Sequence, residues 1–359
     1  MTSGTIYDCL IVGRGLAGSL LAWRLIRRGQ RVAVLDDGLR TAASRVAAGL
    51  VNPLPGLRFN PSPWVFEWLE AADRLYDELA RAAGRPFFHP QPMLRLFRSP
   101  EQRRFHDRLT TRRELAPLLG PAFGPGGAGP AIHAPHGGFR QCRTGHLDLP
   151  ALLDFLGRWL GEAATLREGT ADWRTLERTP RGWRLAGIEA RHLVCCEGYR
   201  AQENPWFAHL PFAPDKGEFL VLTPGEEAGA LPRAIVNGAY WLLPHADGRY
   251  RLGATHDHHL LDMTPTPEGR HRLEKGLEGL LHHPEILQPV DHQAGVRPAT
   301  ADRRPFLGTH PKTSRLHLFN GFGAHGSLSI PWFSQRMADW LLDGRPLPEA
   351  ADLRRFPLP

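Results

Sequence analysis

The sequence predicts an α/β protein with two lobes, in which strands and helices alternate near the N-terminus and strands follow one another later in the chain. The apolar run Leu10-Ile11-Val12 suits a strand buried on both faces, a helical stretch runs from Ser19 to Arg28, and residues 31–36 form a second strand. Residues 216–255 contain further strand-like segments, with the hairpin-type pair Asp247-Gly248 between two of them. A length of 359 residues allows each lobe its own core.

Three glycines join the first strand to the first helix with the spacing G-x-G-x-x-G. Gly13 allows the tight turn, Gly15 lets backbone N–H groups approach a pyrophosphate, and Gly18 lets helix and strand pack closely. The helix N-terminus adds partial positive charge and free donors. Asp36 ends the second strand, where a carboxylate can accept both ribose hydroxyls. This order predicts a Rossmann-like dinucleotide-binding unit; a glycine-rich turn in an unrelated α/β domain is the alternative, and the motif does not separate FAD from NAD.

The chain beyond this unit continues to alternate between helices and strands. Small residues from Thr41 to Pro53 suggest a segment that passes close to a ligand, and a short helix capped by Gly49 is the alternative. Apolar residues at helical spacing predict four further helices, at 61–75, 146–160, 268–281 and up to 342. Strands are expected at 87–98, 132–145, 192–198 and 316–319, with a short β-meander over 164–185 and a Gly/Pro-rich loop over 120–129.

Charge and composition limit the classes of function. A formal net charge of +7 and a pI near 9.7 suit an anionic partner such as RNA, but the arginines are spread along the whole chain. Nucleic-acid binding is therefore not favoured, although it stays open. No apolar run approaches the ~20 residues of a membrane span, and the first residues lack a basic region and a cleavage signal. We therefore expect a soluble, cytoplasmic protein with no membrane partner.

The cysteines and one histidine-rich segment are the candidates for redox or metal chemistry. Cys9, Cys142 and Cys195-Cys196 form no C-x-x-C pair, and most of them lie in apolar strand-like runs, which favours buried, inert thiols. His256-Asp257-His258-His259 follows a strand without the carboxylate or cysteine pattern of a metal site. A polar pocket rim or plain surface is favoured for these histidines, and no metal site is predicted.

Four segments in the same order resemble one enzyme superfamily. Gly13 to Asp36, His146 to Pro150, Gly295 to Pro298 and Asn320 to Gly326 are similar to the D-amino-acid oxidase/glycine oxidase superfamily of FAD-dependent amine oxidoreductases. The resemblance runs from the glycine loop to the last helix and is loose over residues 85–140. It implies a discontinuous Rossmann-like FAD-binding domain with a parallel sheet (1–84, 141–205 and 291–359) and a substrate domain with an antiparallel sheet over the flavin (85–140 and 206–290).

The resemblance also implies a cofactor and a reaction. FAD would be held non-covalently, and the substrate would be a small amine or amino acid. A hydride would pass from the carbon next to nitrogen to flavin N5, the imine would hydrolyse, and molecular oxygen would reoxidise the flavin and release hydrogen peroxide.

Particular residues are implied to form the site. Arg297 stands where glycine oxidase-like enzymes carry the arginine that grips a substrate carboxylate, although a structural arginine before Pro298 is the alternative. Trp241 falls where relatives often have a substrate-facing tyrosine, and Tyr240 adjoins it. His325 would stabilise the reduced flavin or assist oxygen, or else face solvent. The predicted catalytic residues are Arg297, His325, Trp241 and Tyr240. The predicted cofactor-binding residues are Gly13, Gly15, Leu16, Ala17, Gly18, Asp36, Asp37, Ser44, Arg45, Ala48, Gly49, Ala171, Cys196, Glu197, Gly198, Arg297, Gly321, Gly323, Ala324, His325, Gly326 and Ser327.

Two other functions fit the same residues. The turn 321–327 and the tail 344–353 resemble the oxidase domain of the bacterial bifunctional enzyme that processes carboxymethylaminomethyl-uridine in tRNA, which is also an amine oxidation next to a carboxylate. Aromatic residues around Trp241 would instead suit a flavoenzyme that tailors a larger biosynthetic metabolite, or a flavin-binding protein without turnover.

Overall fold

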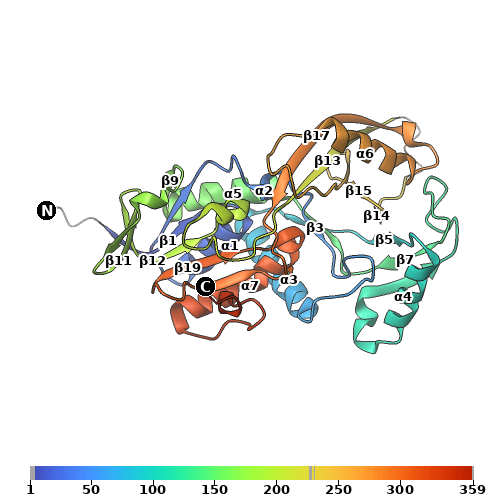
Figure 1. Ribbon diagram of the computed structural model, residues 1–359. Helices are drawn as coiled ribbons and strands as arrows, with labels where there is room; N and C mark the ends of the chain where they lie inside the picture. Colours follow the sequence, from blue (N-terminus) through green and yellow to red (C-terminus); the bar gives the residue numbers. More distant parts are fainter. Residues whose placement is uncertain (1–4, 226–228, 230, 358–359) are drawn as a thin grey trace.

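A sheet built around β1 organises the part of the molecule that contains the N-terminus (Figure 1). The computed structural model describes residues 5–225, 229 and 231–357. β1 (Ile6–Val12) pairs in parallel with β2 (Val32–Asp36) on one side and with β12 (Ile188–Cys195) on the other. The strand order is β10-β11-β12-β1-β2-β9, and β19 also pairs with β12. The other strands of this sheet are β9 (Thr165–Glu168), β10 (Glu177–Thr179), β11 (Gly182–Leu185), β18 (Phe306–Thr309) and β19 (Leu316–Asn320).

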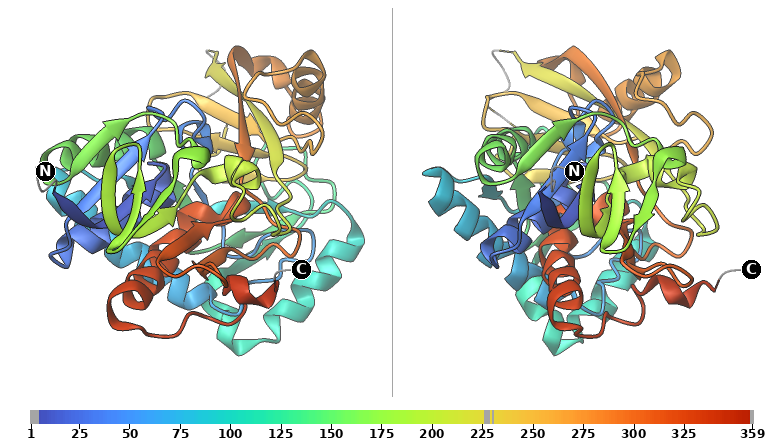
Figure 2. Two further views of the ribbon diagram at one scale, coloured as in Figure 1. Left: turned by 60° about the vertical axis from the view of Figure 1, so that its left-hand side comes forward. Right: turned by 90° about the vertical axis from the view of Figure 1, so that its left-hand side faces the viewer.

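Helices cover this sheet and form its main core. α1 packs against α5 and α7, and α3 packs against α7, so segments from both ends of the chain lie together (Figure 2). Leu20, Leu152 and Phe333 of this core are fully buried because each lies on the apolar stripe of its helix. The bounds are α1 (Leu16–Arg27), the short α2 (Ala43–Val46), α3 (Val65–Ala83), α5 (Leu149–Ala163) and α7 (Gly326–Asp343).

A second sheet, mostly antiparallel, forms the other part of the molecule in the order β17-β13-β16-β15-β14-β5-β7-β6. Its longest pairing joins β13 to β17. α6 (Pro267–Glu278) covers one face, where Leu220, Leu252 and Leu273 are buried. The strands are β5 (Met93–Leu96), β6 (Leu119–Phe123), β7 (Gly138–Gln141), β13 (Asp215–Pro224), β14 (Ile235–Asn237), β15 (Trp241–Pro244), β16 (Tyr250–Gly253) and β17 (Leu287–Arg297).

The strands of a small third sheet alternate along the chain with strands of the two larger sheets. Its order is β3-β8-β4, formed by β3 (Leu50–Val51), β4 (Phe88–Pro90) and β8 (Gly145–Leu147), and α4 (Pro100–Thr110) follows β5. None of the helices within the described ranges combines the length and apolar character needed to cross a bilayer.

Some expected elements differ in position or partner. The segment 164–185 is not a meander: β9 pairs in parallel with the open edge of β2, and Trp173–Thr175 is a short 3-10 turn, so a hairpin forms between β10 and β11 alone in this segment. β6 occupies the start of the predicted loop 120–129 because its backbone pairs with β7 at the sheet edge. His146 belongs to β8, and α5 begins after Asp148, whose Oδ1 accepts a hydrogen bond from Ala151 N at 3.1 Å.

The start of the first helix and one proposed domain boundary can be compared with the structure. α1 begins at Leu16 rather than Ser19, directly at the glycine loop. The proposed domain boundary at residue 291 falls inside β17, which continues through Arg297 as the partner of β13. The division into domains stays a prediction.

Candidate functional site

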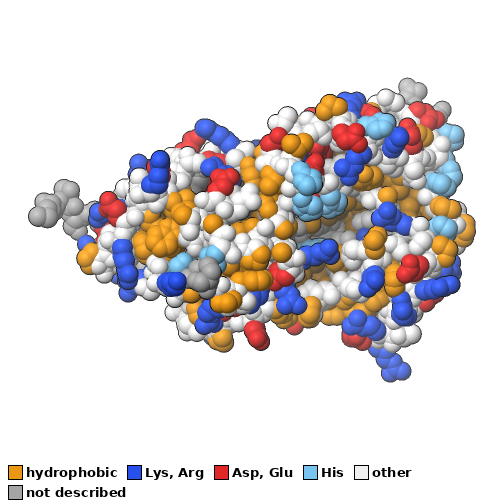
Figure 3. All heavy atoms as spheres, viewed as in Figure 1, with side chains coloured by type: hydrophobic (Ala, Val, Ile, Leu, Met, Phe, Trp, Pro, Cys, Tyr) orange, Lys and Arg blue, Asp and Glu red, His pale blue; other side chains and the backbone are white. Residues whose placement is uncertain are grey.

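A cavity of about 510 Å³ extends from the glycine loop to the second sheet. It is lined by the carboxyl ends of β1, β2 and β12, by α2, by the start of α7, and by one face of β13, β15, β16 and β17. Figure 3 shows this face of the molecule hollowed between the part that carries β1 and the part that carries β13. The carboxyl ends of parallel strands are where open α/β sheets bind ligands.

The glycine loop has the shape that its spacing predicts. Gly13 has φ +99°, and a Cβ there would collide with the Cys196 carbonyl. A Cβ on Gly18 would collide with the Gly13 carbonyl, so Gly18 serves helix–strand packing and does not line the cavity. Gly15 differs, because a Cβ there would meet only Ser44 Oγ, at 3.6 Å. The open space above Gly15 faces the cavity and the N-terminus of α1.

Asp36 is fixed at the end of β2 by backbone donors. Its Oδ2 accepts from Arg14 N at 2.7 Å, and its Oδ1 accepts from Gly38 N and Leu39 N, each at 2.9 Å. The Arg14 guanidinium lies nearby, with Nε 3.8 Å from Oδ1. The carboxylate therefore has a set orientation at the cavity edge, with one lone-pair position of Oδ2 left for a ribose hydroxyl.

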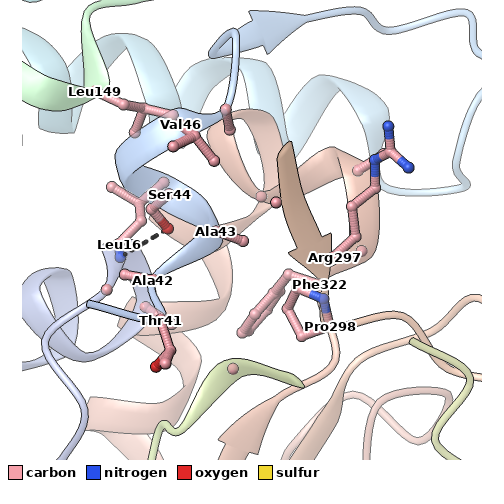
Figure 4. Close-up of a pocket in the computed structure, with 18 of the residues that line it drawn as sticks. Leu16, Thr41, Ala42, Ala43, Ser44, Val46, Leu149, Arg297, Pro298 and Phe322 are labelled. Atoms are coloured by element: carbon pink, nitrogen blue, oxygen red, sulfur yellow. Dashed lines mark hydrogen bonds between the residues drawn. The ribbon is translucent and has the colours of Figure 1, made fainter. Parts of the chain in front are cut away.

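Small residues of α2 form the cavity wall beside the glycine loop. Ser44 Oγ accepts a hydrogen bond from Leu16 N at 3.2 Å and so links α2 to the start of α1 (Figure 4). Ala43 and Val46 pack toward Gly295 of β17, where a Cβ would collide with Val46. The segment of small residues thus lies along the cavity, as expected for a segment close to a ligand.

Glu197 follows β12 and faces the same end of the cavity. Its Oε1 accepts from Trp173 Nε1 at 3.0 Å and its Oε2 from Asn204 Nδ2 at 2.8 Å. Burial nevertheless raises the pKa of Glu197 to about 7. The group therefore changes charge near neutral pH beside the glycine loop.

The turn between β19 and α7 supplies another part of the cavity wall. Gly323 has φ +52°, and Gly323 to Ser327 line the cavity. His325 is the N-cap residue of α7. Burial and the charge of Arg303 lower the pKa of His325, so its imidazole is neutral at neutral pH. The first N–H groups of α7 favour negative charge in front of them.

The second sheet contributes the remaining wall. Phe219, Trp241 and Gly253 lie next to one another across β13, β15 and β16 and line the cavity. Arg297 ends β17, also lines the cavity, and donates from Nη1 to Asp215 Oδ2 at 2.8 Å. His256 Nδ1 lies 2.7 Å from the same Asp215 oxygen.

The structure brings most of the predicted site residues to one cavity. Four lie outside its lining. Gly18 packs inside the loop, and Tyr240 turns to α6, where its ring lies against Gly276. Arg45 pairs with Asp154 on α5, and Gly321 packs against Thr300 and Pro305. The predicted residues that do line the cavity are Gly13, Gly15, Leu16, Ala17, Asp36, Asp37, Ser44, Ala48, Gly49, Ala171, Cys196, Glu197, Gly198, Trp241, Arg297, Gly323, Ala324, His325, Gly326 and Ser327.

Sequence reasoning missed the partner of Arg297. Asp215 precedes the strand that was expected to begin at Lys216, and alternation along that strand places Asp215, Gly217 and Phe219 on one face. That alternation was the available signal, but the pairing of β13 with β17 was needed to place Asp215 opposite Arg297.

The cysteines and the histidine-rich segment have the following surroundings in the described residues. Cys9, Cys195 and Cys196 are buried, and burial raises the pKa of each thiol. In the described ranges, no three or more His, Cys, Asp or Glu side chains are placed to hold a metal ion. His258 Nδ1 lies 3.0 Å from the Pro214 carbonyl.

The fold and the cavity define the class of dinucleotide-binding proteins. The glycine loop lies at one end of the cavity, and the second sheet forms its wall at the other end. The family model described as FAD dependent oxidoreductase (DAO) matches residues 8–340. The chain therefore belongs to this family of oxidoreductases, and its cofactor is FAD. Gly15, with its open space, and Asp36, with its fixed carboxylate, fit the diphosphate and ribose of that cofactor.

Individual relatives support the same family. Glycine oxidase of Pseudomonas aeruginosa is 27% identical over 354 residues, covering 94% of each chain. The tRNA 5-methylaminomethyl-2-thiouridine biosynthesis bifunctional protein MnmC of Azoarcus sp. is 28% identical over 96% of this chain, which spans 58% of that protein's length. The structure of glycine oxidase from Geobacillus kaustophilus superposes with a TM-score of 0.84 at 24% identity, over 99% of both chains, and shows the shared fold.

Proposed function

We propose that this protein oxidises a C–N bond of a small amine or amino acid. The observation that carries the proposal is the single cavity that joins the glycine loop and Asp36 to a wall made of Phe219, Trp241 and Arg297. The similarity to glycine oxidases supports the choice of an amine or amino acid as substrate. Bound FAD would accept a hydride from the carbon next to the substrate nitrogen and pass two electrons to oxygen, giving hydrogen peroxide and an imine that water hydrolyses.

The chain's own residues bind, orient and shield the reactants. The open position at Gly15 and the N-terminus of α1 would hold the diphosphate, and Asp36 would hold the ribose. Phe219 and Trp241 form an apolar wall whose burial of the substrate excludes water from the reacting carbon. The start of α7 places N–H groups, and the neutral imidazole of His325 beside them, where they would stabilise developing negative charge.

The direct test is flavin reduction. We expect the purified protein to be yellow, and its flavin absorbance to bleach anaerobically with at least one member of a panel of small amines and amino acids. Readmitted air should restore the colour and release hydrogen peroxide. A yellow protein that dithionite reduces, but that no amine or amino acid bleaches, would contradict the proposal.

A second candidate follows from the similarity to MnmC over nearly the whole of this chain. A tRNA wobble-uridine side chain carries a comparable C–N bond, and the net charge of +7 favours a polyanion. This candidate requires tRNA binding whose logarithmic affinity falls linearly with the logarithm of salt concentration. An absence of binding at low salt would remove it.

A further inference from the structure

The arginine at the substrate end of the cavity already has a carboxylate partner within the protein. Arg297 Nη1 donates to Asp215 Oδ2 at 2.8 Å, and their side chains are 18% and 10% exposed. The two residues are directly paired across β13 and β17, so the contact is set by the register of the sheet. The pair has no net charge where a substrate carboxylate would need a free cation.

Asp215 is held in its ionised form. His256 Nδ1 lies 2.7 Å from Asp215 Oδ2, and Asp257 N donates to Oδ1 at 3.3 Å. Burial acts to raise the pKa of Asp215, but the hydrogen bond to His256 and the charge of Arg297 outweigh it and hold the pKa below its usual value. The carboxylate is therefore charged at neutral pH.

Part of the remaining donor set of Arg297 is also directed at the sheet. Nη1 and Nη2 both donate to the Thr255 carbonyl at 3.3 Å. The guanidinium lies over Gly217, where a Cβ would collide with it. Figure 4 shows it on the opposite side of the drawn cavity from Leu16 and Ser44. Nη1 is thus committed to protein acceptors, and Nε–H and one Nη2–H are the donors of Arg297 for which the described residues supply no acceptor.

We propose that Asp215 determines substrate specificity by neutralising Arg297, so that the cavity prefers an amine whose neighbouring group is uncharged, such as an amide or ester, over a free amino acid. The inference deepens the proposed function and rests on it, because it assumes that an amine substrate binds in this cavity. An incoming carboxylate would either displace Asp215, leaving a mostly buried carboxylate without its main partner, or dock beside it against like charge. An uncharged carbonyl oxygen avoids both costs while accepting one hydrogen bond.

The test measures binding rather than turnover. Benzoate and benzamide have the same shape and differ in charge, and their dissociation constants can be measured by calorimetry on the FAD-loaded protein. We expect the wild type to bind benzamide at least as tightly as benzoate. Asp215→Asn should tighten benzoate binding at least tenfold and change benzamide binding less than threefold. Asp291→Asn is the matched control, because Asp291 is an exposed carboxylate on the same strand as Arg297 and contacts His292 and Gln293 instead.

The double variant Asp215→Asn/Arg297→Gln guards against a merely structural effect. It has no charged pair, so we expect it to lose the tenfold gain for benzoate while keeping its flavin. A wild type that already prefers benzoate tenfold, an Asp215→Asn variant that leaves the ratio within threefold, or a wild type that binds neither probe would each overturn the inference. The proposed function is judged separately by flavin bleaching, so its failure is distinguishable from failure here.

Discussion

Gly13 and Gly15 lie two residues apart in one loop but have different surroundings. A Cβ on Gly13 would meet the backbone of Cys196, and its φ of +99° disfavours any side chain. A Cβ on Gly15 would meet no protein atom closer than Ser44 Oγ at 3.6 Å. The first glycine is therefore required by the fold, whereas the second leaves room for something outside the protein.

This contrast predicts that Gly15→Ala separates folding from cofactor binding. We expect its free energy of unfolding without added FAD to stay within about 1 kcal/mol of the wild type, since the added methyl group finds open space. The same methyl group occupies the approach to the diphosphate, so the dissociation constant for FAD should rise at least tenfold in a fluorescence titration. Gly161→Ala, at an open and exposed position in α5, serves as the control and should leave FAD affinity unchanged. Unaltered FAD affinity in Gly15→Ala would show that the loop does not hold the diphosphate.

At the scale of elements, the pairing of β12 with β19 places the half-buried His192 against the buried His317. His192 Nδ1 lies 2.9 Å from His317 Nε2, and His317 Nδ1 lies 2.9 Å from Thr309 Oγ1. Burial, and to a lesser extent His192, lowers the pKa of His317 to about 3. A neutral imidazole is therefore part of the native sheet, whereas the unfolded chain takes up a proton at the usual histidine pKa of about 6.5.

The sign of the resulting pH dependence follows from linkage. Between about pH 6.5 and pH 3 the unfolded chain binds a proton that the folded sheet does not, so stability is lost as pH falls through this range. This group alone should lower the free energy of unfolding by about 2 kcal/mol between pH 8 and pH 5. In urea denaturation, His317→Gln should reduce the loss of unfolding free energy between pH 8 and pH 5 by that amount, whatever the variant's stability at pH 8. His271→Gln, at an exposed position on α6, should leave the fall unchanged, and an equal fall in all three proteins would contradict the assignment.

Local pattern predicted the elements better than it predicted their partners. The apolar run of β1, the glycine loop and Asp36 are close in sequence, so spacing alone placed Gly13, Gly15 and Asp36 together, and the structure brings them to one end of the cavity. β9 was assigned to the wrong neighbours because its residues are exposed and their pattern does not show which strand edge is open. Asp215 was missed for a related reason, since its role depends on a partner 82 residues away in sequence.

At the scale of the whole molecule, the cavity wall is shared between two sheets whose strands come from separate parts of the chain. Gly13, Asp36 and Ser327 belong to the part around β1, whereas Phe219 and Trp241 belong to the second sheet. The family resemblance predicted this arrangement, but the sequence could not show that Tyr240 would turn toward α6 while Trp241 faced the cavity. Tyr240 directly precedes β15 and Trp241 is its first residue, and the two neighbouring side chains point to different sides of the sheet.

Because both parts of the molecule line one cavity, a ligand that fills this cavity should stabilise them together. A ligand that binds the folded state alone adds about 2.7 kcal/mol at a free concentration of 100 times its dissociation constant. We therefore expect FAD to raise the urea midpoint of the flavin-depleted protein and to keep unfolding in one transition. Fluorescence of the tryptophans reports on both parts, since Trp23 lies in the core around α1 and Trp241 lies in the second sheet. NAD at the same concentration is the control, because it shares the adenosine and diphosphate but has no isoalloxazine ring to reach the second sheet. Equal stabilisation by NAD and FAD would mean that the cavity recognises the adenosine diphosphate alone, and the flavin-side wall assigned to Trp241 and the start of α7 would then be wrong.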